Sequence, residues 1–369
     1  MADSDQESDE LALRAPIINT SPGREYADEK RMFQGIPGIE RASNGRLWAV
    51  WYGGGTGETG ENYIMLATSE DDGETWSDLK AVIDPPFPVR AFDPCLWIDP
   101  EYDLHLFWAQ SYNHFDGRAG VWHVTAEDPG EEDTAWSEPT RISNGVMMNK
   151  PTVLSDGTWL LPTAVWGRSE RDDVPAEEKR PNVFASPDRG GSWSLRGGPE
   201  MPGEKFSEHM IVEKLDQTLW MLIRVEGGIA QSFSRDRGTT WSNAELWRIR
   251  HPTARFYIRR LLSGNLILVK HGPLDELTGR SHLTAYISED DGDTWLGGLV
   301  IDEREGVSYP DAVQSPEGTI YVIYDFERRG AKRILLATFT EEDDVKSGQW
   351  TSDRSRRRIL VNQATGAAP

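Results

Sequence analysis

The sequence predicts an all-β fold, a six-bladed β-propeller with four strands in each blade. The first observation is a box with the pattern Ser-x-Asp-x-Gly-x-Thr/Ser-Trp, whose copies begin at Ser69, Ser186, Ser234 and Ser288. Tryptophans close these boxes and two degenerate copies, at Trp76, Trp136, Trp193, Trp241, Trp295 and Trp350. A period of roughly 50 to 60 residues is typical of repeated four-stranded units.

The second observation is a two-residue turn between apolar strands in every unit. The turns are Asn44-Gly45, Tyr102-Asp103, Asp156-Gly157, Asp216-Gln217, Ser263-Gly264 and Glu317-Gly318. Most of them contain glycine, which takes the positive φ of a tight hairpin at little cost. The strands that follow are apolar, as at residues 47–52 and 320–324. Six such units predict a closed propeller.

The residues of the box have structural roles. Its Ser, Asp and Thr oxygens can bond turn amides, its glycine takes a strained φ, and its tryptophan fills the apolar gap between blades. A calcium-binding loop is the competing interpretation of the Asp-x-Gly pattern, but no Glu follows at ligand spacing. We therefore interpret the boxes as scaffold.

The domain organisation follows from the repeats. We expect a propeller over residues 31–353, an acidic and partly disordered segment over residues 1–30, and a C-terminal strand and tail over residues 354–369. Neither a run of 18 uncharged apolar residues nor a charged-then-apolar leader is visible, so a cytoplasmic location without membrane contact is expected. Cys95 is the single cysteine, which excludes an internal disulfide and a thiolate metal cluster. We expect it to be buried in the inner strand of the second blade.

The net charge of −22 argues against a nucleic-acid partner, because affinity for phosphate backbones comes from clustered Lys and Arg. In a propeller the leading ends of the inner strands share one mouth of the central channel. These starts carry many charged side chains here, at residues 33–37, 89–94, 148–151, 206–210, 253–260 and 307–311. Burying a charge costs several kcal/mol unless it is paired or meets a polar ligand. An oxygen-rich ligand such as a carbohydrate is therefore predicted at this mouth.

With these boxes and strand starts the chain resembles the sialidase superfamily over residues 33–325. Glu208 on the fourth inner strand is followed by Arg224, which resembles the second arginine of the family's carboxylate-binding triad. Arg280 precedes the next box and resembles the third arginine. The segment Ser308-Tyr309-Pro310-Asp311 resembles the one that carries the family's nucleophilic tyrosine.

The resemblance implies a retaining exo-glycoside hydrolase. Glu208 would take the proton of Tyr309 as the phenol attacks the anomeric carbon. A tyrosine nucleophile suits a substrate with an anionic anomeric substituent, which would repel a carboxylate. In the glycine-rich loop 53–62, Glu58 lies nearest in register to the family's acid/base, and Glu61 is the alternate. Arg224 and Arg280 would grip a terminal acidic or otherwise oxygen-rich sugar.

The first arginine of the family's triad is absent, because Gly35 stands where the Phe/Tyr-Arg-Ile-Pro motif has it. One possibility is that Arg90 or Lys150 supplies the charge from a neighbouring blade, although Arg90 also has Asp93 nearby as a partner. The other possibility is a substrate without a carboxylate at this position.

Further polar residues near the strand starts are compatible with a second class of enzyme. His209 and His271 adjoin the predicted site, and a propeller polysaccharide lyase uses His, Tyr and Arg on uronate-containing glycans. We count both histidines, together with Asp93 and Asp311, among the residues expected to contact sugar. The histidines lack paired ligand spacing, so no metal site and no cofactor are predicted. A non-catalytic glycan-binding propeller is the third class.

Overall fold

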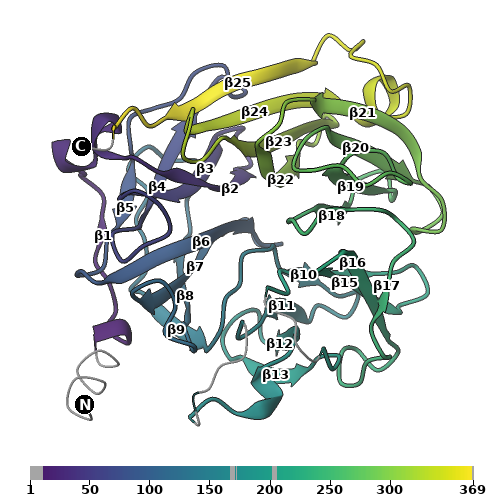
Figure 1. Cartoon of the computed structure of the whole chain (residues 1–369), viewed down its shortest axis with the longest axis horizontal. Helices are drawn as coiled ribbons and strands as arrows, with labels where there is room; N and C mark the ends of the chain where they lie inside the picture. Colours follow the sequence, from purple (N-terminus) through teal and green to yellow (C-terminus); the bar gives the residue numbers. More distant parts are fainter. Residues whose placement is uncertain (1–10, 167–170, 172, 202–205, 368–369) are drawn as a thin grey trace.

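The computed structural model describes residues 11–166, 171, 173–201 and 206–367, and they form a six-bladed β-propeller (Figure 1). The first ten residues of the predicted acidic segment lie outside the described residues. Each blade is built from consecutive strands that pair in antiparallel order. The predicted fold class is therefore confirmed.

Each blade begins at the channel and ends at the rim (Figure 1). The inner strands are β2 (Gln34–Arg41), β6 (Val89–Ile98), β10 (Thr152–Val153), β14 (Met210–Glu213), β18 (Tyr257–Arg260) and β22 (Val307–Gln314). The second strands are β3 (Leu47–Gly53), β7 (Leu104–Tyr112), β11 (Trp159–Thr163), β15 (Leu219–Val225), β19 (Leu266–His271) and β23 (Thr319–Phe326). The third strands are β4 (Tyr63–Ser69), β8 (Val121–Ala126), β12 (Asn182–Ser186), β16 (Gly228–Ser234), β20 (Leu283–Ser288) and β24 (Arg333–Thr340).

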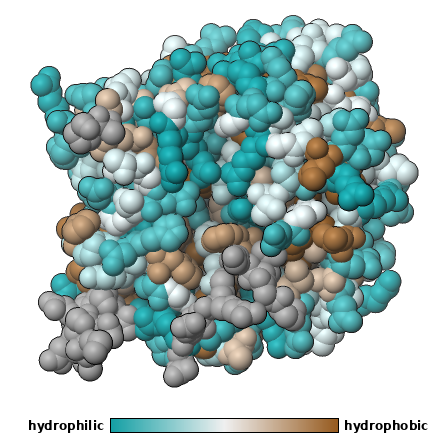
Figure 2. Space-filling view, in the orientation of Figure 1, coloured by the Kyte–Doolittle hydropathy of each residue, from teal (hydrophilic) through white to brown (hydrophobic). Residues whose placement is uncertain are grey.

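The outer strands are β5 (Ala81–Ile83), β9 (Thr140–Ser143), β13 (Ser194–Gly197), β17 (Glu245–Leu246), β21 (Leu296–Asp302) and β25 (Arg356–Gln363). The strand β1 (Ile18–Asn19) pairs with β5 as a fifth strand of the first blade. The short helices are η1 (Arg24–Tyr26), η2 (Asp28–Lys30), η3 (Ala176–Glu178) and η4 (Glu341–Val345). No helix in the described part of the chain is long and apolar enough to cross a membrane. The face seen in Figure 2 is mostly hydrophilic.

The boxes make the hydrogen bonds predicted for them. In the box of the fourth blade, Asp236 accepts bonds from the Thr240 amide at 2.8 Å and the Thr240 hydroxyl at 2.6 Å. The indole of Trp241 donates to the carbonyl of Gly238 at 2.9 Å, and Gly238 has a φ of 91°. Trp241 packs against the apolar cluster between the third and fourth blades. The boxes therefore fasten each blade to its neighbour.

The ring closes where the sixth blade meets the first. The strand expected after residue 353 is β25, the outer strand of the sixth blade, and its end runs back beside η1 and η2 (Figure 1). The buried guanidinium of Arg31 donates to the carbonyl of Tyr26 and, at 2.9 Å, to the side chain of Asn362. The Thr365 amide donates to the carbonyl of Asp28 at 2.9 Å. Both ends of the chain thus hold this junction.

Three inner strands carry a bulge just where the predicted site lies. The register shifts between Gly35 and Gly38, between Phe92 and Cys95, and between Ser308 and Asp311. Each bulge has a residue with positive φ directly before a proline: Ile36 at 55°, Asp93 at 48° and Tyr309 at 53°. A bulge redirects a side chain out of the regular pleat, and bulges are frequent beside active sites.

Candidate functional site

A cavity of about 530 Å³ opens at the mouth formed by the bulged strands. All six blades contribute to its wall. The lining residues are Tyr52, Glu58, Arg90, Phe92, Asp93, His114, Phe115, Trp166, Phe206, Glu208, Arg224, Arg280, Tyr309 and Arg328. The predicted residues that line it are therefore Tyr309, Glu208, Glu58, Arg224, Arg280, Arg90 and Asp93.

Tyr309 meets a glutamate and an arginine inside this cavity. Its hydroxyl donates to Glu208 Oε1 at 3.5 Å, and Arg224 Nη1 lies 3.4 Å from the same hydroxyl. Arg224 also donates to Glu208 Oε1, whereas Glu208 Oε2 has no hydrogen bond within the described ranges. Burial raises the pKa of Tyr309, nearby Glu208 raises it further, and the surrounding arginines oppose both. The phenol is therefore protonated at neutral pH, and a base must remove its proton before it can act as a nucleophile.

Two more arginines flank the ring of Tyr309. The guanidinium carbon of Arg280 lies 5.4 Å from the ring centroid, and that of Arg328 lies 5.0 Å away. Arg280 donates to the Ser308 hydroxyl at 2.9 Å, and Arg328 donates to Glu58 Oε1 at 3.0 Å. Together with Arg224, three guanidinium groups surround the phenol.

Arg328 was missed by sequence reasoning, although Gly35 was a signal for it. A Cβ atom placed on Gly35 would lie 2.4 Å from Arg328 Cδ and 2.6 Å from its Cγ. The stem of Arg328 therefore occupies the space beside Gly35, where Arg90 or Lys150 was expected to place its charge. Arg90 instead stacks 3.9 Å from the centroid of Phe92 and donates to the carbonyl of His114 at 3.1 Å.

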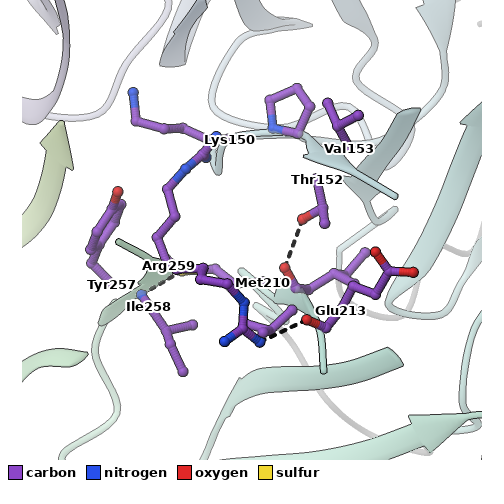
Figure 3. A pocket seen from close by; sticks show the side chains of 12 residues that line it. Lys150, Thr152, Val153, Met210, Glu213, Tyr257, Ile258 and Arg259 are labelled. Atoms are coloured by element: carbon purple, nitrogen blue, oxygen red, sulfur yellow. Dashed lines mark hydrogen bonds between the residues drawn. The ribbon is translucent and has the colours of Figure 1, made fainter. Parts of the chain in front are cut away.

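Lys150 and Asp311, which were predicted to contact sugar, do not line this cavity. Lys150 Nζ donates to the carbonyl of Ile39 at 2.6 Å and to Glu40 at 2.7 Å, and it lies 3.3 Å from Asp311. Asp311 accepts a bond from the Ile39 amide at 2.9 Å. Both side chains are thus used in the channel, where they tie the inner strands together. Lys150 lies in the wall of a separate cavity of about 300 Å³, with Arg259 and Tyr257 (Figure 3).

His209 and His271 are also outside the cavity. The ring of His209 bonds the carbonyl of Asn182 at 2.6 Å, and that of His271 bonds the carbonyl of Val307 at 3.0 Å. Burial lowers the pKa of each histidine to about 4. They are neutral residues of the scaffold, and His114 is the histidine that lines the cavity.

The two candidates for the acid/base differ in position. Glu58 lines the cavity and is half-buried, whereas Glu61 is exposed and packs near Gly55, away from the lining residues. Glu61 is therefore the weaker candidate. Asp93 is buried in the cavity wall, and burial raises its pKa to about 7 although Arg90 opposes the shift.

The cavity is lined by both charged and aromatic side chains. Four arginines face three carboxyl groups, those of Glu58, Asp93 and Glu208, although the whole chain has a net charge of −22. Its apolar rings are those of Phe92, Phe115, Trp166 and Phe206. The rings of Trp166 and Phe206 meet edge to face at 5.4 Å between centroids. Such a site can hold an anion against its arginines and the apolar face of a sugar against its rings.

A metal-binding cluster is not part of this arrangement. In the portion of the chain that the structure describes, no three His, Cys, Asp or Glu side chains are grouped to hold a metal ion. Cys95 is buried in β6, as predicted.

Comparisons with known proteins agree with the fold. A family model described as a BNR repeat-like domain matches residues 45–322. A sialidase from Paraclostridium sordellii is 26% identical over 237 residues, which are 56% of this chain and 56% of that protein. The solved structure of the Hadza microbial sialidase Hz136 has a TM-score of 0.66 and 19% identity, covering 81% of this chain and 65% of that one.

The same fold is found with another activity. An α-L-arabinofuranosidase from Fusarium graminearum has a TM-score of 0.61 and 11% identity, covering 89% of this chain and 98% of that one. The chain spans less than two thirds of the length of the two sialidases. The family model covers well over half of the chain, and the six blades match those of the sialidase structures. The chain therefore belongs to the BNR repeat-like domain family, as a sialidase-like member of it.

Proposed function

We propose that the chain is a retaining exo-glycoside hydrolase that removes a terminal acidic sugar, with Tyr309 as its nucleophile. The observation that carries the proposal is the contact of Tyr309 with Glu208 at 3.5 Å, inside a ring of three arginines. A phenol with a raised pKa needs a nearby base, and Glu208 is the carboxylate within reach.

The first step forms a covalent intermediate. The oxygen of Tyr309 attacks the anomeric carbon while its proton moves to Glu208. The bond to the leaving oxygen breaks, and that oxygen takes a proton from Glu58, which lines the same cavity. In the second step water attacks the same carbon, Glu58 takes the water proton, and Tyr309 regains its proton from Glu208. Two displacements retain the anomeric configuration.

The charge of the cavity supports an anionic substrate. Four arginines and three carboxyl groups line the pocket, so the arginines are in excess there although the whole chain has a net charge of −22. A charge-assisted bond from an arginine to a carboxylate contributes about 1.5–3 kcal/mol. The similarity to sialidases, whose name denotes action on sialic acid, supports a 2-keto acid sugar as the first substrate to test.

A panel of fluorogenic glycosides tests the proposal. We expect release of the fluorophore from an N-acetylneuraminic acid glycoside or another acidic sugar, and none from an α-L-arabinofuranoside. Tyr309→Phe should abolish this release. A lyase would instead act on uronate-containing glycans and give an unsaturated product that absorbs in the ultraviolet. Full activity of Tyr309→Phe, or activity on the arabinofuranoside alone, would contradict the proposal.

A further inference from the structure

Gly35 and Arg328 lie on different blades, and the stem of Arg328 fills the space next to Gly35. Gly35 is on β2 of the first blade, and Arg328 follows β23 of the sixth. A Cβ atom on Gly35 would lie 2.4 Å and 2.6 Å from the Arg328 stem, and 2.8 Å from Asp325 Oδ2. These contacts are with the stem of Arg328 and with a buried carboxylate, so any side chain at position 35 would force the arginine out of its place.

The guanidinium of Arg328 is directed into the cavity and retains bonding capacity. Its Nη1 donates to Glu58, and its Nε lies 4.0 Å from Asp325. Its Nη2 has no hydrogen bond within the described residues. The guanidinium also lies 5.0 Å from the ring centroid of Tyr309, on which Arg280 and Arg224 converge.

Arg328 also lies beside a buried carboxylate of the sixth blade, that of Asp325. Asp325 already accepts a bond from the Ile36 amide at 2.9 Å, and burial raises its pKa to about 6. The Nε atom of Arg328 faces this carboxylate at 4.0 Å, whereas its Nη1 atom bonds Glu58 in the cavity wall, so the pair with Asp325 does not occupy the whole guanidinium.

We propose that Arg328 supplies the third guanidinium that binds the substrate's carboxylate, entering from the sixth blade through the space that Gly35 leaves open. Arg328 is then a specificity-determining residue, and Gly35 is its steric complement. Glu58 holds the guanidinium in place until the substrate's carboxylate binds. The inference rests on the proposed function and adds to it the residue that replaces the absent arginine of β2.

Binding to an inactive chain separates recognition from chemistry. In a Tyr309→Phe background, isothermal titration calorimetry measures the affinity for N-acetylneuraminic acid and for its uncharged methyl ester. Adding Arg328→Ala should lower the affinity for the acid by about 10- to 100-fold and that for the ester by much less, because one charge-assisted pair is lost. Arg328→Lys should retain part of the preference for the acid.

Two further variants control for charge and for steric fit. Arg329→Ala removes the same charge from the neighbouring exposed position and should leave the preference for the acid unchanged. Gly35→Arg should weaken binding when Arg328 is present, because the two side chains collide. In the Arg328→Ala background the same substitution should restore part of the preference, since it returns a guanidinium from β2.

The outcomes distinguish the inference from the proposed function. If the parent chain prefers the acid and Arg328→Ala leaves that preference intact, the inference is overturned while the proposed function stands. If the parent chain does not distinguish the acid from its ester, the proposed function fails, and the inference fails with it.

Discussion

At the scale of single residues, the proposed mechanism depends on the contact between Glu208 and Tyr309. Glu208→Gln keeps the size of the side chain and its bond to Arg224 but removes the base for the phenol. We expect kcat to fall by about 100- to 1000-fold on the active acidic glycoside, because general-base catalysis contributes that much. Steady-state kinetics measure the effect.

A matched control lies on the same blade. Glu213 is at the other end of β14 and bonds Ser155 at the opposite mouth, far from the cavity lining. Glu213→Gln should therefore leave kcat unchanged. Equal losses of activity in the two variants would assign Glu208 to the scaffold.

The raised pKa of Asp93 leads us to expect that the stability of the fold depends on pH. Its pKa is about 7 in the folded chain against an ordinary value of 3.8, mainly through burial. Between those values the folded chain binds a proton that the unfolded chain does not, so this group lowers stability as pH rises, by at most about 1.4 kcal/mol per pH unit. The effect is absent below pH 3.8 and complete above pH 7.

Asp93→Asn should remove that contribution. Relative to the parent chain, the variant should gain stability as pH rises from about 4 to about 7 and gain no more beyond it. Urea unfolding of both chains across this range measures the difference. A difference that stays constant with pH would show that Asp93 is ionised throughout.

Most residues of the candidate site could be predicted from short segments of the sequence. Glu208, Arg224, Arg280 and Tyr309 were assigned through the resemblance to the sialidase superfamily, and the structure brings them together in one cavity. Arg328 was missed because its partner Gly35 is in another blade, and packing across the closure of the ring leaves no local pattern. The absence of a side chain at Gly35 was visible, but the residue that fills the gap was not.

At the scale of elements, the strand order was predictable and the bulges were not. The turns and boxes numbered the blades, so the starts of the inner strands could be located. Lys150 and Asp311 were then assigned to the mouth although they face the channel, where each finds buried partners. Side chains along an inner strand alternate between two directions, and the bulge between Ser308 and Asp311 changes which one Asp311 takes.

Substitutions at two glycines of the fifth blade can distinguish the cost of backbone strain from the cost of disturbed packing. Gly264 has a φ of 89°, and a Cβ added there would meet no atom within 4 Å. Gly292 has a φ of 98°, and a Cβ added there would lie 2.5 Å from the ring of Trp220. Gly264→Ala should cost about 1 kcal/mol through strain alone. Gly292→Ala should cost about 1–3 kcal/mol more, because the box packs on the fourth blade.

Urea unfolding of the two variants tests that role of the boxes. Because the box lies at the rim and not at the mouth, the remaining folded protein should keep its kcat in both cases. Equal stability losses would mean that the box of the fifth blade does not hold it against the fourth.

At the scale of the whole molecule, the ring is closed by side chains and chain ends. Arg31 is fully buried and bonds Tyr26, Gln34 and Asn362, which come from both sides of the junction. Arg31→Ala should destabilise the chain by about 2–4 kcal/mol, because all the hydrogen bonds of a fully buried guanidinium are lost together. The exposed Arg24 on η1 offers a control, and Arg24→Ala should change stability by less than about 0.5 kcal/mol. Comparable melting temperatures for the two variants would contradict this account of closure.

The closed ring has a consequence for function, because every blade contributes to one cavity. A chain that loosens at the junction should lose the alignment of Arg328 from the sixth blade with Tyr52 and Glu58 from the first. The distribution of charge in the molecule also bears on function. A strongly acidic chain places four arginines at a single mouth, and under the proposed function these arginines attract the anionic substrate.

The covalent intermediate on Tyr309 is the most direct test of the central claim. A 2-keto acid sugar with fluorine at the anomeric carbon and at the adjacent carbon reacts quickly and hydrolyses slowly, so the intermediate accumulates. Intact-mass and peptide mass spectrometry then locate the sugar. We predict one added sugar per chain, attached to Tyr309 and absent from Tyr309→Phe. A sugar attached to Glu58 or Glu208, or turnover of the acidic glycoside with no adduct, would contradict the account.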